Sequence, residues 1–198
     1  DFKWREPERD DTFAAMSQPH NTRLIDYLAL KDSEPEDPLE ICEIDLRGAY
    51  YQTPQDEECF VEPPEEWIKH YRLKGNDGNV MWKLKKQLPG QRAAGIRFLE
   101  LVKLRFATIG LEPCPAFPNI YRIPNTRVVI DTHMDDWHLV GRHSELTALI
   151  PKLREAFKLE ATDLFVHGLY AHLKRERIKA PEGTFLTVSY THLRAHET

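Results

Sequence analysis

Residues 128–140 read Val-Val-Ile-Asp-Thr-His-Met-Asp-Asp-Trp-His-Leu-Val, and this stretch decides how the rest of the chain is organised. Two apolar runs typical of strands, residues 128–134 and 137–140, are separated only by Asp135 and Asp136. Two residues is the spacing of a tight β-hairpin, and aspartate is a favoured turn residue. The sequence therefore predicts a hairpin with the acidic pair at its tip.

Further strands are predicted on both sides of this hairpin. Residues 41–45 alternate apolar and polar side chains, as expected of a half-buried strand that ends at Asp45. Shorter strands are predicted at residues 60–62 and 81–84, and a last one at residues 166–173.

Helical periodicity predicts three helices. They are residues 21–31, capped by Asn21 or Thr22; residues 95–108, ended by Gly110; and residues 144–157, capped by Ser144 and kinked or restarted at Pro151. The expected apolar faces are Leu24, Ile25 and Leu28 on the first helix, and Leu99, Val102, Phe106 and Ile109, widened by Phe98 and Leu101, on the second. Hairpins and helices without regular strand–helix–strand alternation indicate an α+β fold, with a mostly antiparallel sheet packed on helices.

Composition limits the possibilities further. The 198 residues, 41% of them hydrophobic, suffice for one domain with a core. The net charge of −5 does not favour a nucleic-acid partner, but residues 32–66 are acidic and residues 69–105 mostly basic, so one face could still meet phosphates. Three widely spaced cysteines indicate no zinc site. With no signal sequence and no membrane-spanning run, we expect an intracellular protein with reduced thiols.

Three carboxylates carry the candidate chemistry. Asp45 ends one strand, while Asp135 and Asp136 lie at the tip of a hairpin far along the chain. Joining nucleotides requires divalent ions held by carboxylates from separate strands, and magnesium prefers such hard oxygen ligands. Each piece alone has a plainer reading: an acidic pair is often only a turn, and Asp45 could be a solvated strand end.

Four sequence blocks resemble copia-type (Pseudoviridae-like) retrotransposon reverse transcriptases, in family order. They are Ile-Asp-Leu-Arg-Gly-Ala-Tyr-Tyr at 44–51, Asp-Glu-Glu-Cys-Phe-Val-Glu-Pro-Pro at 56–64, Trp-Lys-Leu-Lys-Lys-Gln-Leu-Pro-Gly at 82–90, and His-Met-Asp-Asp at 133–136, where the family has Tyr-Val-Asp-Asp. The resemblance extends over residues 11–175.

This resemblance implies a right-hand polymerase palm with partial fingers, and an RNA-directed DNA polymerase activity. It implies that Asp45, Asp135 and Asp136 are the catalytic carboxylates and hold Mg²⁺ or Mn²⁺. It places Tyr50 and Gly90 at the incoming nucleotide, where the Tyr50 ring would exclude a ribose 2′-hydroxyl. Without the resemblance, Tyr50 is equally well explained as a half-buried aromatic residue.

The resemblance also implies partners. Lys85, Lys86, Arg92 and His133 would contact the primer–template, although the three basic side chains are equally typical of a solvated face. Deoxynucleoside triphosphates would be substrates, and integrase and RNase H would belong to the same polyprotein.

Several departures argue against activity of the isolated chain. His133 and Pro89 each replace a family tyrosine, Gly95 replaces a proline, and the basic fingers hairpin would have to precede Thr12. We therefore expect a partial or decayed copy, inactive by itself. Two other hypotheses stay open: a catalytically dead nucleic-acid-binding remnant, and an unrelated acidic α+β domain.

The expected organisation is an irregular segment at residues 1–11, one polymerase domain at 12–180, and a disordered tail at 181–198. Residues 188–198 resemble a translated sequencing adapter, so His192 and His196 are not interpreted as metal ligands.

Overall fold

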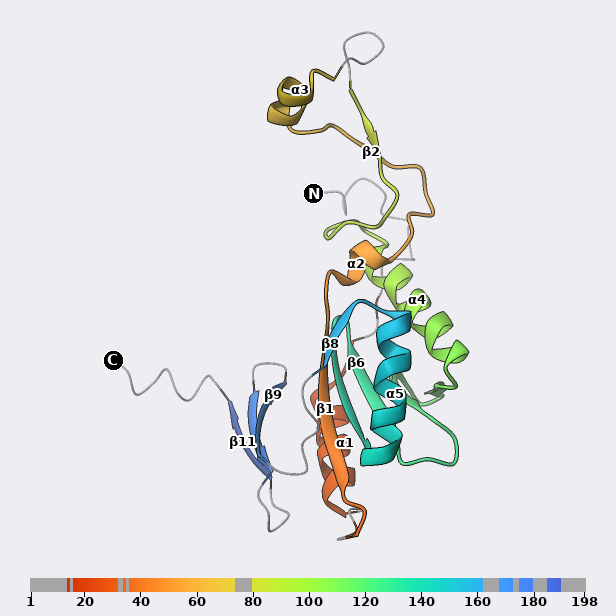
Figure 1. Cartoon of the computed structure of the whole chain (residues 1–198), viewed down its shortest axis with the longest axis vertical. Coiled ribbons are helices and arrows are strands. Elements are labelled where there is room, and N and C mark those ends of the chain that lie inside the picture. Colours follow the sequence, from red (N-terminus) through yellow and green to blue (C-terminus); the bar gives the residue numbers. More distant parts are fainter. Residues whose placement is uncertain are drawn as a thin grey trace, which may run out of the picture.

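The computed structural model describes Ala14 and residues 16–31, 34, 36–73, 80–161, 168–172, 175–179 and 185–189, with side-chain surroundings only as far as residue 161. A six-stranded sheet in the order β4-β5-β6-β7-β1-β8 forms its centre, and all neighbouring strands are antiparallel (Figure 1). The strands are β1 (Leu39–Leu46), β4 (Glu112–Cys114), β5 (Phe117–Arg122), β6 (Val129–His133), β7 (Asp136–Arg142) and β8 (Leu159–Ala161). The predicted mixture of helices and antiparallel sheet is confirmed.

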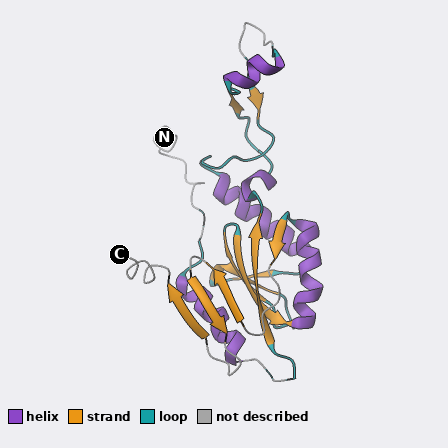
Figure 2. Ribbon diagram, turned by 60° about the vertical axis from the view of Figure 1, so that its left-hand side comes forward, coloured by secondary structure: helices purple, strands orange, loops and turns teal. Residues whose placement is uncertain are grey.

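Helices cover both faces of this sheet. Helix α1 (Pro19–Lys31) packs on one face, and α4 (Ala94–Thr108) and α5 (His143–Ala156) pack on the other (Figure 2). Alternation along β1 supplies both cores, because successive side chains of a strand point to opposite faces. Ile41 joins α1, whereas Cys42 and Ile44 join the larger core beneath α4 and α5.

An aromatic cluster in the larger core supports the β6–β7 hairpin from behind. The Phe106 ring meets those of Tyr121, Trp137 and Phe157 edge-on, with centroids 4.8, 4.9 and 5.9 Å away. Trp137 is fully buried, and its indole N–H donates to the Met134 carbonyl at 2.9 Å. The core therefore fixes the turn that follows β6.

The remaining elements lie outside the main sheet. Strands β2 (Phe60–Val61) and β3 (Trp82–Lys83) pair antiparallel, and α3 (Glu65–Tyr71) lies between them in sequence; this unit projects beyond the sheet (Figure 1). The short α2 (Ala49–Gln52) follows β1. Strands β9 (Gly168–His172), β10 (Arg175–Lys179) and β11 (Phe185–Ser189) form a separate antiparallel sheet. None of the described helices has the length and apolarity needed to cross a membrane.

Two details predicted for α5 are wrong. The helix continues through Pro151 without a break, because Leu149, Ile150 and Leu153 are buried and packing outweighs the lost backbone hydrogen bond. It also begins before Ser144: the N-cap is Arg142, whose backbone N–H donates to the Glu145 carboxylate at 3.1 Å.

The predicted face of α1 is only partly correct. The helix begins at Pro19, a residue favoured at the first helical position, so Asn21 and Thr22 are inside it and neither is the cap. Ile25 is buried as predicted, but Leu24 is 40% exposed. Polar side chains take part of the buried face instead, because the sheet surface beneath carries the buried Asp131 and His138 beside its apolar residues. The buried positions of α1 are Asn21, Thr22, Ile25, Asp26 and Ala29.

Several other elements agree with the prediction, whereas α2, α3, β4, β5, β8 and β10 were not predicted. Helix α4 covers the expected range, although Phe98 and not Leu99 lies at the centre of its buried stripe. Strands β2, β3 and β9 fall within the ranges predicted for them, and residues 166, 167 and 173 lie outside the described residues. Strand β11 falls within the segment expected to be a disordered tail; the other residues of 181–198 are outside the described part.

Candidate active site

The β6–β7 hairpin turns at Met134 and Asp135, one residue earlier than the sequence predicts. His133 and Asp136 face each other across the turn, so Asp136 is the first residue of β7. Met134 has φ of 53°, whereas Asp135 has no positive φ, which is the pattern of a type II′ turn. A positive φ in a residue other than glycine is strained, and such strain is typical of functional sites.

This one-residue difference brings two of the three predicted carboxylates into direct register. Asp45 on β1 is the Cα partner of Asp136 on β7, so their Cβ atoms lie about 4.5–5.5 Å apart on the same face. The Leu46 N–H donates to the Asp135 carbonyl at 2.9 Å, which extends the pairing to the turn. Asp45 and Asp135 are exposed, and Asp136 is half-buried. The expected adjacency of the two strands is confirmed.

The Asp45–Asp136 pair belongs to a row of ionisable residues across four strands. His133, Asp136, Asp45 and Glu160 are successive cross-strand partners on β6, β7, β1 and β8. Glu160 forms an ion pair with Arg47 at the outer end of the row. His133 therefore lies beside Asp136 within the sheet. The basic residues predicted to bind nucleic acid with it, Lys85, Lys86 and Arg92, lie in the segment between β3 and α4.

A small cavity of about 210 Å³ opens beside the turn, between it and the start of α2. Its lining is Gly48, Ala49, Tyr50, Tyr51, Pro89, Met134 and Asp135. The Tyr50 ring packs edge-on against Phe98, with centroids 6.1 Å apart, and its hydroxyl lies 4.0 Å from the Met134 sulfur. Burial, reinforced by the Asp135 carboxylate, raises the pKa of Tyr50 and keeps the phenol neutral. Tyr50 and Asp135 thus line the same cavity.

The carboxylates of this site suit a metal ion whose remaining ligands are water molecules and substrate oxygens. Within the described part of the chain, no group of three or more carboxylate, imidazole or thiol side chains is arranged so that it could hold a metal ion. Magnesium is commonly bound by one or two carboxylates, with water and substrate phosphates completing its octahedron. The Asp45–Asp136 pair provides two hard oxygen donors and fits that mode, with Asp135 one residue away in the turn.

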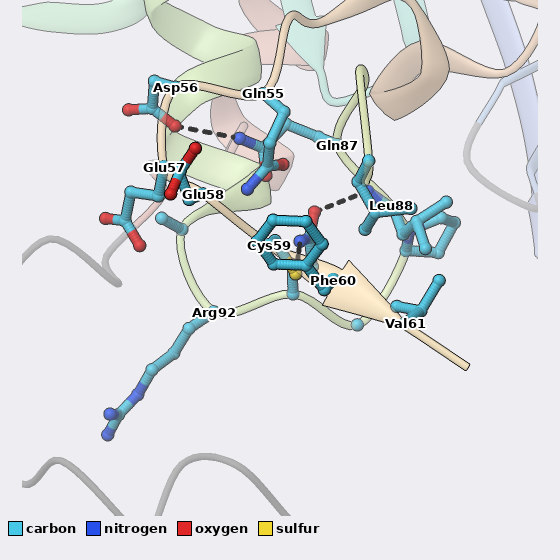
Figure 3. A pocket seen from close by; sticks show the side chains of 15 residues that line it. Gln55, Asp56, Glu57, Glu58, Cys59, Phe60, Val61, Gln87, Leu88 and Arg92 are labelled. Carbon is cyan, nitrogen blue, oxygen red and sulfur yellow. Dashed lines mark hydrogen bonds between the residues drawn. The ribbon is translucent and has the colours of Figure 1, made fainter. Parts of the chain in front are cut away.

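Other predicted contact residues surround a larger cavity of about 740 Å³ (Figure 3). Gly90 and Arg92 line it, so Gly90 is not in the cavity of Tyr50, although its neighbour Pro89 lines both. Lys85 and Lys86 are exposed in the segment between β3 and α4. Of the predicted nucleotide and nucleic-acid contacts, Tyr50 thus lines the smaller cavity and Gly90 and Arg92 line the larger one. The others, Lys85, Lys86 and His133, line neither.

A buried charged cluster was not predicted. It lies next to the Asp45–Asp136 pair, on the same face of the sheet. His138, fully buried on β7, contacts the carboxylate of its cross-strand partner Glu43 through Nδ1 and that of Asp26 on α1 through Nε2, the latter at 3.1 Å. Burial alone lowers the pKa of His138, but the attraction of Glu43 and the hydrogen bonds to both carboxylates outweigh it and raise the pKa to about 9. The available signal was spacing: Glu43 lies two residues before Asp45 and His138 two residues after Asp136, which is how facing residues are placed on antiparallel strands.

No protein-family model matches the chain, and no curated protein does. Two solved telomerases are similar to it in structure. Apo telomerase from Candida tropicalis, truncated from its C-terminal domain, has 10% sequence identity over 88% of this chain and 41% of that one, with a TM-score of 0.50. Telomerase from Candida albicans, in complex with a fragment of telomeric RNA, has 12% identity over 90% and 36%, with a TM-score of 0.43.

The chain spans less than half of either telomerase chain. At 10% identity, the likeness to the Candida tropicalis protein shows the fold alone: the helices and antiparallel sheet of this chain are arranged as in part of that protein.

Proposed function

We propose that this chain is the palm, with part of the fingers, of a copia-type retrotransposon reverse transcriptase, an RNA-directed DNA polymerase. The observation that carries the proposal is the direct pairing of Asp45 and Asp136 beside a strained turn, whose residues Met134 and Asp135 line the cavity of Tyr50. The similarity in fold to telomerase, itself a reverse transcriptase, supports the class, and the four motif blocks support the copia-type family.

In this proposal Asp45 and Asp136 hold the divalent ion, Mg²⁺ or Mn²⁺, and Asp135 presents its carboxylate at the cavity. The bound ion would supply activation of the primer 3′-hydroxyl and stabilisation of the leaving phosphate oxygen. The protein contributes position: the indole of Trp137 fixes the turn, and the Leu46 N–H fixes β1 against it.

Tyr50 would form the floor beneath the sugar of a deoxynucleoside triphosphate. Its ring is held by Phe98 and Met134, so it cannot easily retreat from a ribose 2′-hydroxyl. Lys85, Lys86 and Arg92 would meet phosphates of the primer–template, and His133 would lie near the primer end. The integrase and RNase H of the polyprotein would be partners of this domain.

Replacing Tyr50 with alanine should remove discrimination against ribonucleotides. We expect wild-type protein in Mg²⁺ to bind dATP at least about ten-fold more tightly than ATP, because a fixed ring opposes the extra hydroxyl. In Tyr50→Ala the two affinities should converge, whereas Tyr50→Phe should keep the difference. Isothermal titration calorimetry measures both affinities without requiring turnover.

Tyr27→Ala is a matched control, since Tyr27 is 52% exposed on α1 and does not line the cavity. Equal affinity of the wild-type protein for ATP and dATP would contradict the assignment of the cavity to a deoxynucleotide.

A further inference from the structure

Three aromatic side chains cluster on the β2–β3 unit, mostly outside the motif blocks. Trp67 and Tyr71 on α3 have ring centroids 4.9 Å apart, and Trp82 on β3 meets Trp67 edge-on at 5.6 Å. Their side chains nevertheless stay 49%, 55% and 36% exposed, and no residue of α3 is buried. The three rings hold this unit together while leaving much of their surface open.

The exposed surface of these rings indicates a binding site. A seven-residue helix with no buried side chain gains little from its own hydrogen bonds, because helices this short are marginal in water. Clustered exposed aromatic surface, in contrast to scattered apolar residues, commonly marks a binding site. The ring cluster, defined as Trp67, Tyr71 and Trp82, is therefore a candidate contact surface.

The ring cluster is continuous with the cavities of the candidate active site. Val61, the cross-strand partner of Trp82, lines the larger cavity together with Phe60. That cavity adjoins the smaller one at Pro89, which lines both. A ligand could therefore run from the cavity of Tyr50, through the larger cavity, to the rings. Figure 3 shows Phe60 and Leu88 within the larger cavity.

Charge along this route suits an anionic ligand with aromatic groups. Lys83 lies beside Trp82 in sequence, and its ammonium group sits 5.8 Å above the Phe60 ring. Two of the acids that line the larger cavity are paired with cations: Glu58 pairs with Lys83, and the Asp56 carboxylate lies 2.6 Å from Arg97. Proteins hold single-stranded nucleic acid in this way, with bases stacked on exposed rings and lysines beside the backbone.

We propose that the ring cluster and the larger cavity bind single-stranded nucleic acid, with bases stacked on Trp67, Tyr71 and Trp82. The direction of the strand toward Tyr50 rests on the proposed function, whereas the stacking itself does not. Stacking accepts any base, so affinity should depend little on sequence and should fall steeply as salt is added.

The test is the affinity of the full chain for a short fluorescein-labelled oligothymidylate, measured by fluorescence anisotropy at low salt. Trp67→Ala and Tyr71→Ala should each weaken binding about ten-fold, the loss typical of one stacked base. Trp67→Phe and Tyr71→Phe should restore most of the affinity, since a ring remains. Leu104→Ala, which removes a 67% exposed apolar side chain from α4, should change nothing. Circular dichroism of each variant separates loss of stacking from loss of folding.

Two results would overturn the proposal: folded alanine variants that bind like wild type, or an equal loss in Leu104→Ala. In the first case, the rings would be a docking site for protein. Failure here is distinguishable from failure of the proposed function. If the oligonucleotide does not bind through the rings but dATP still binds, only the proposal for the ring cluster is refuted. If the oligonucleotide binds through the rings but neither nucleotide nor metal binds, the ring-cluster proposal is supported and the proposed polymerase function is refuted.

Discussion

Replacing His138 with leucine should lower the free energy of unfolding by about 3–5 kcal/mol, the range observed when one partner of a buried ion pair is removed. Leucine fills much of the volume, but Glu43 and Asp26 would lose the imidazole that lies between them. The side chains of Asp26 and Glu43 are only 12% and 10% exposed, so solvent can replace little of the lost interaction. A loss of this size is a large fraction of the stability of an ordinary domain. Urea denaturation followed by far-UV circular dichroism measures it.

His143→Leu is the matched control for this prediction. His143 also contacts a carboxylate, that of Glu40, but its side chain is 66% exposed. Glu40 is itself buried, but its imidazole partner is mostly in water, so the pair is largely screened and this variant should lose much less stability than His138→Leu. The double variant His138→Leu/Glu43→Leu should recover part of the loss, because an apolar pair replaces a charged one. Equal effects of His138→Leu and His143→Leu would contradict the cluster.

The same cluster should make the fold less stable at alkaline pH. The folded-state pKa of His138, about 9, lies above its ordinary value of 6.5, so the protonated imidazole stabilises the fold fully below pH 6.5. This contribution is lost as the pH rises through about 9, and integrating the shift gives about 3 kcal/mol. The carboxylates that face His138 are Glu43 on β1 and Asp26 on α1, with Asp131 as its cross-strand partner on β6.

Denaturation at a series of pH values between 6 and 10 checks this expectation. Wild-type protein should lose stability over the upper half of that range, and His138→Leu should show a flatter profile there. Parallel profiles for the two proteins would mean that another group causes the alkaline loss.

The main hairpin illustrates what the sequence could and could not predict. Its position follows from two apolar runs two residues apart, and the structure places a hairpin there. The turn residues were wrong by one position, because aspartate is commoner in turns than methionine and a strained Met134 has no local sequence signal. Since side chains alternate along a strand, this difference is what aligns Asp136 with Asp45.

The face of the sheet beneath α1 was unpredictable for another reason. Periodicity arguments assume that buried positions are apolar, and they select Leu24 for the core. In the structure the buried partners of α1 include both apolar and polar residues, and Asp26 contacts His138, which lies far away in sequence. Such pairing depends on strand register, which local patterns do not specify. Helix α4, packed on an ordinary apolar core, was predicted almost to the residue.

The central claim, that Asp45 and Asp136 form one metal site, is tested most directly by titrating the protein with Mn²⁺ and measuring the free ion by electron paramagnetic resonance. We expect one site of highest affinity in the wild-type protein. Asp45→Asn and Asp136→Asn should each weaken it at least about ten-fold, and the double variant should weaken it little further, because both carboxylates serve one ion. Glu65→Gln, a loss of one exposed carboxylate on α3, should leave it unchanged. Undiminished Mn²⁺ binding in the Asp45→Asn/Asp136→Asn double variant would contradict the claim.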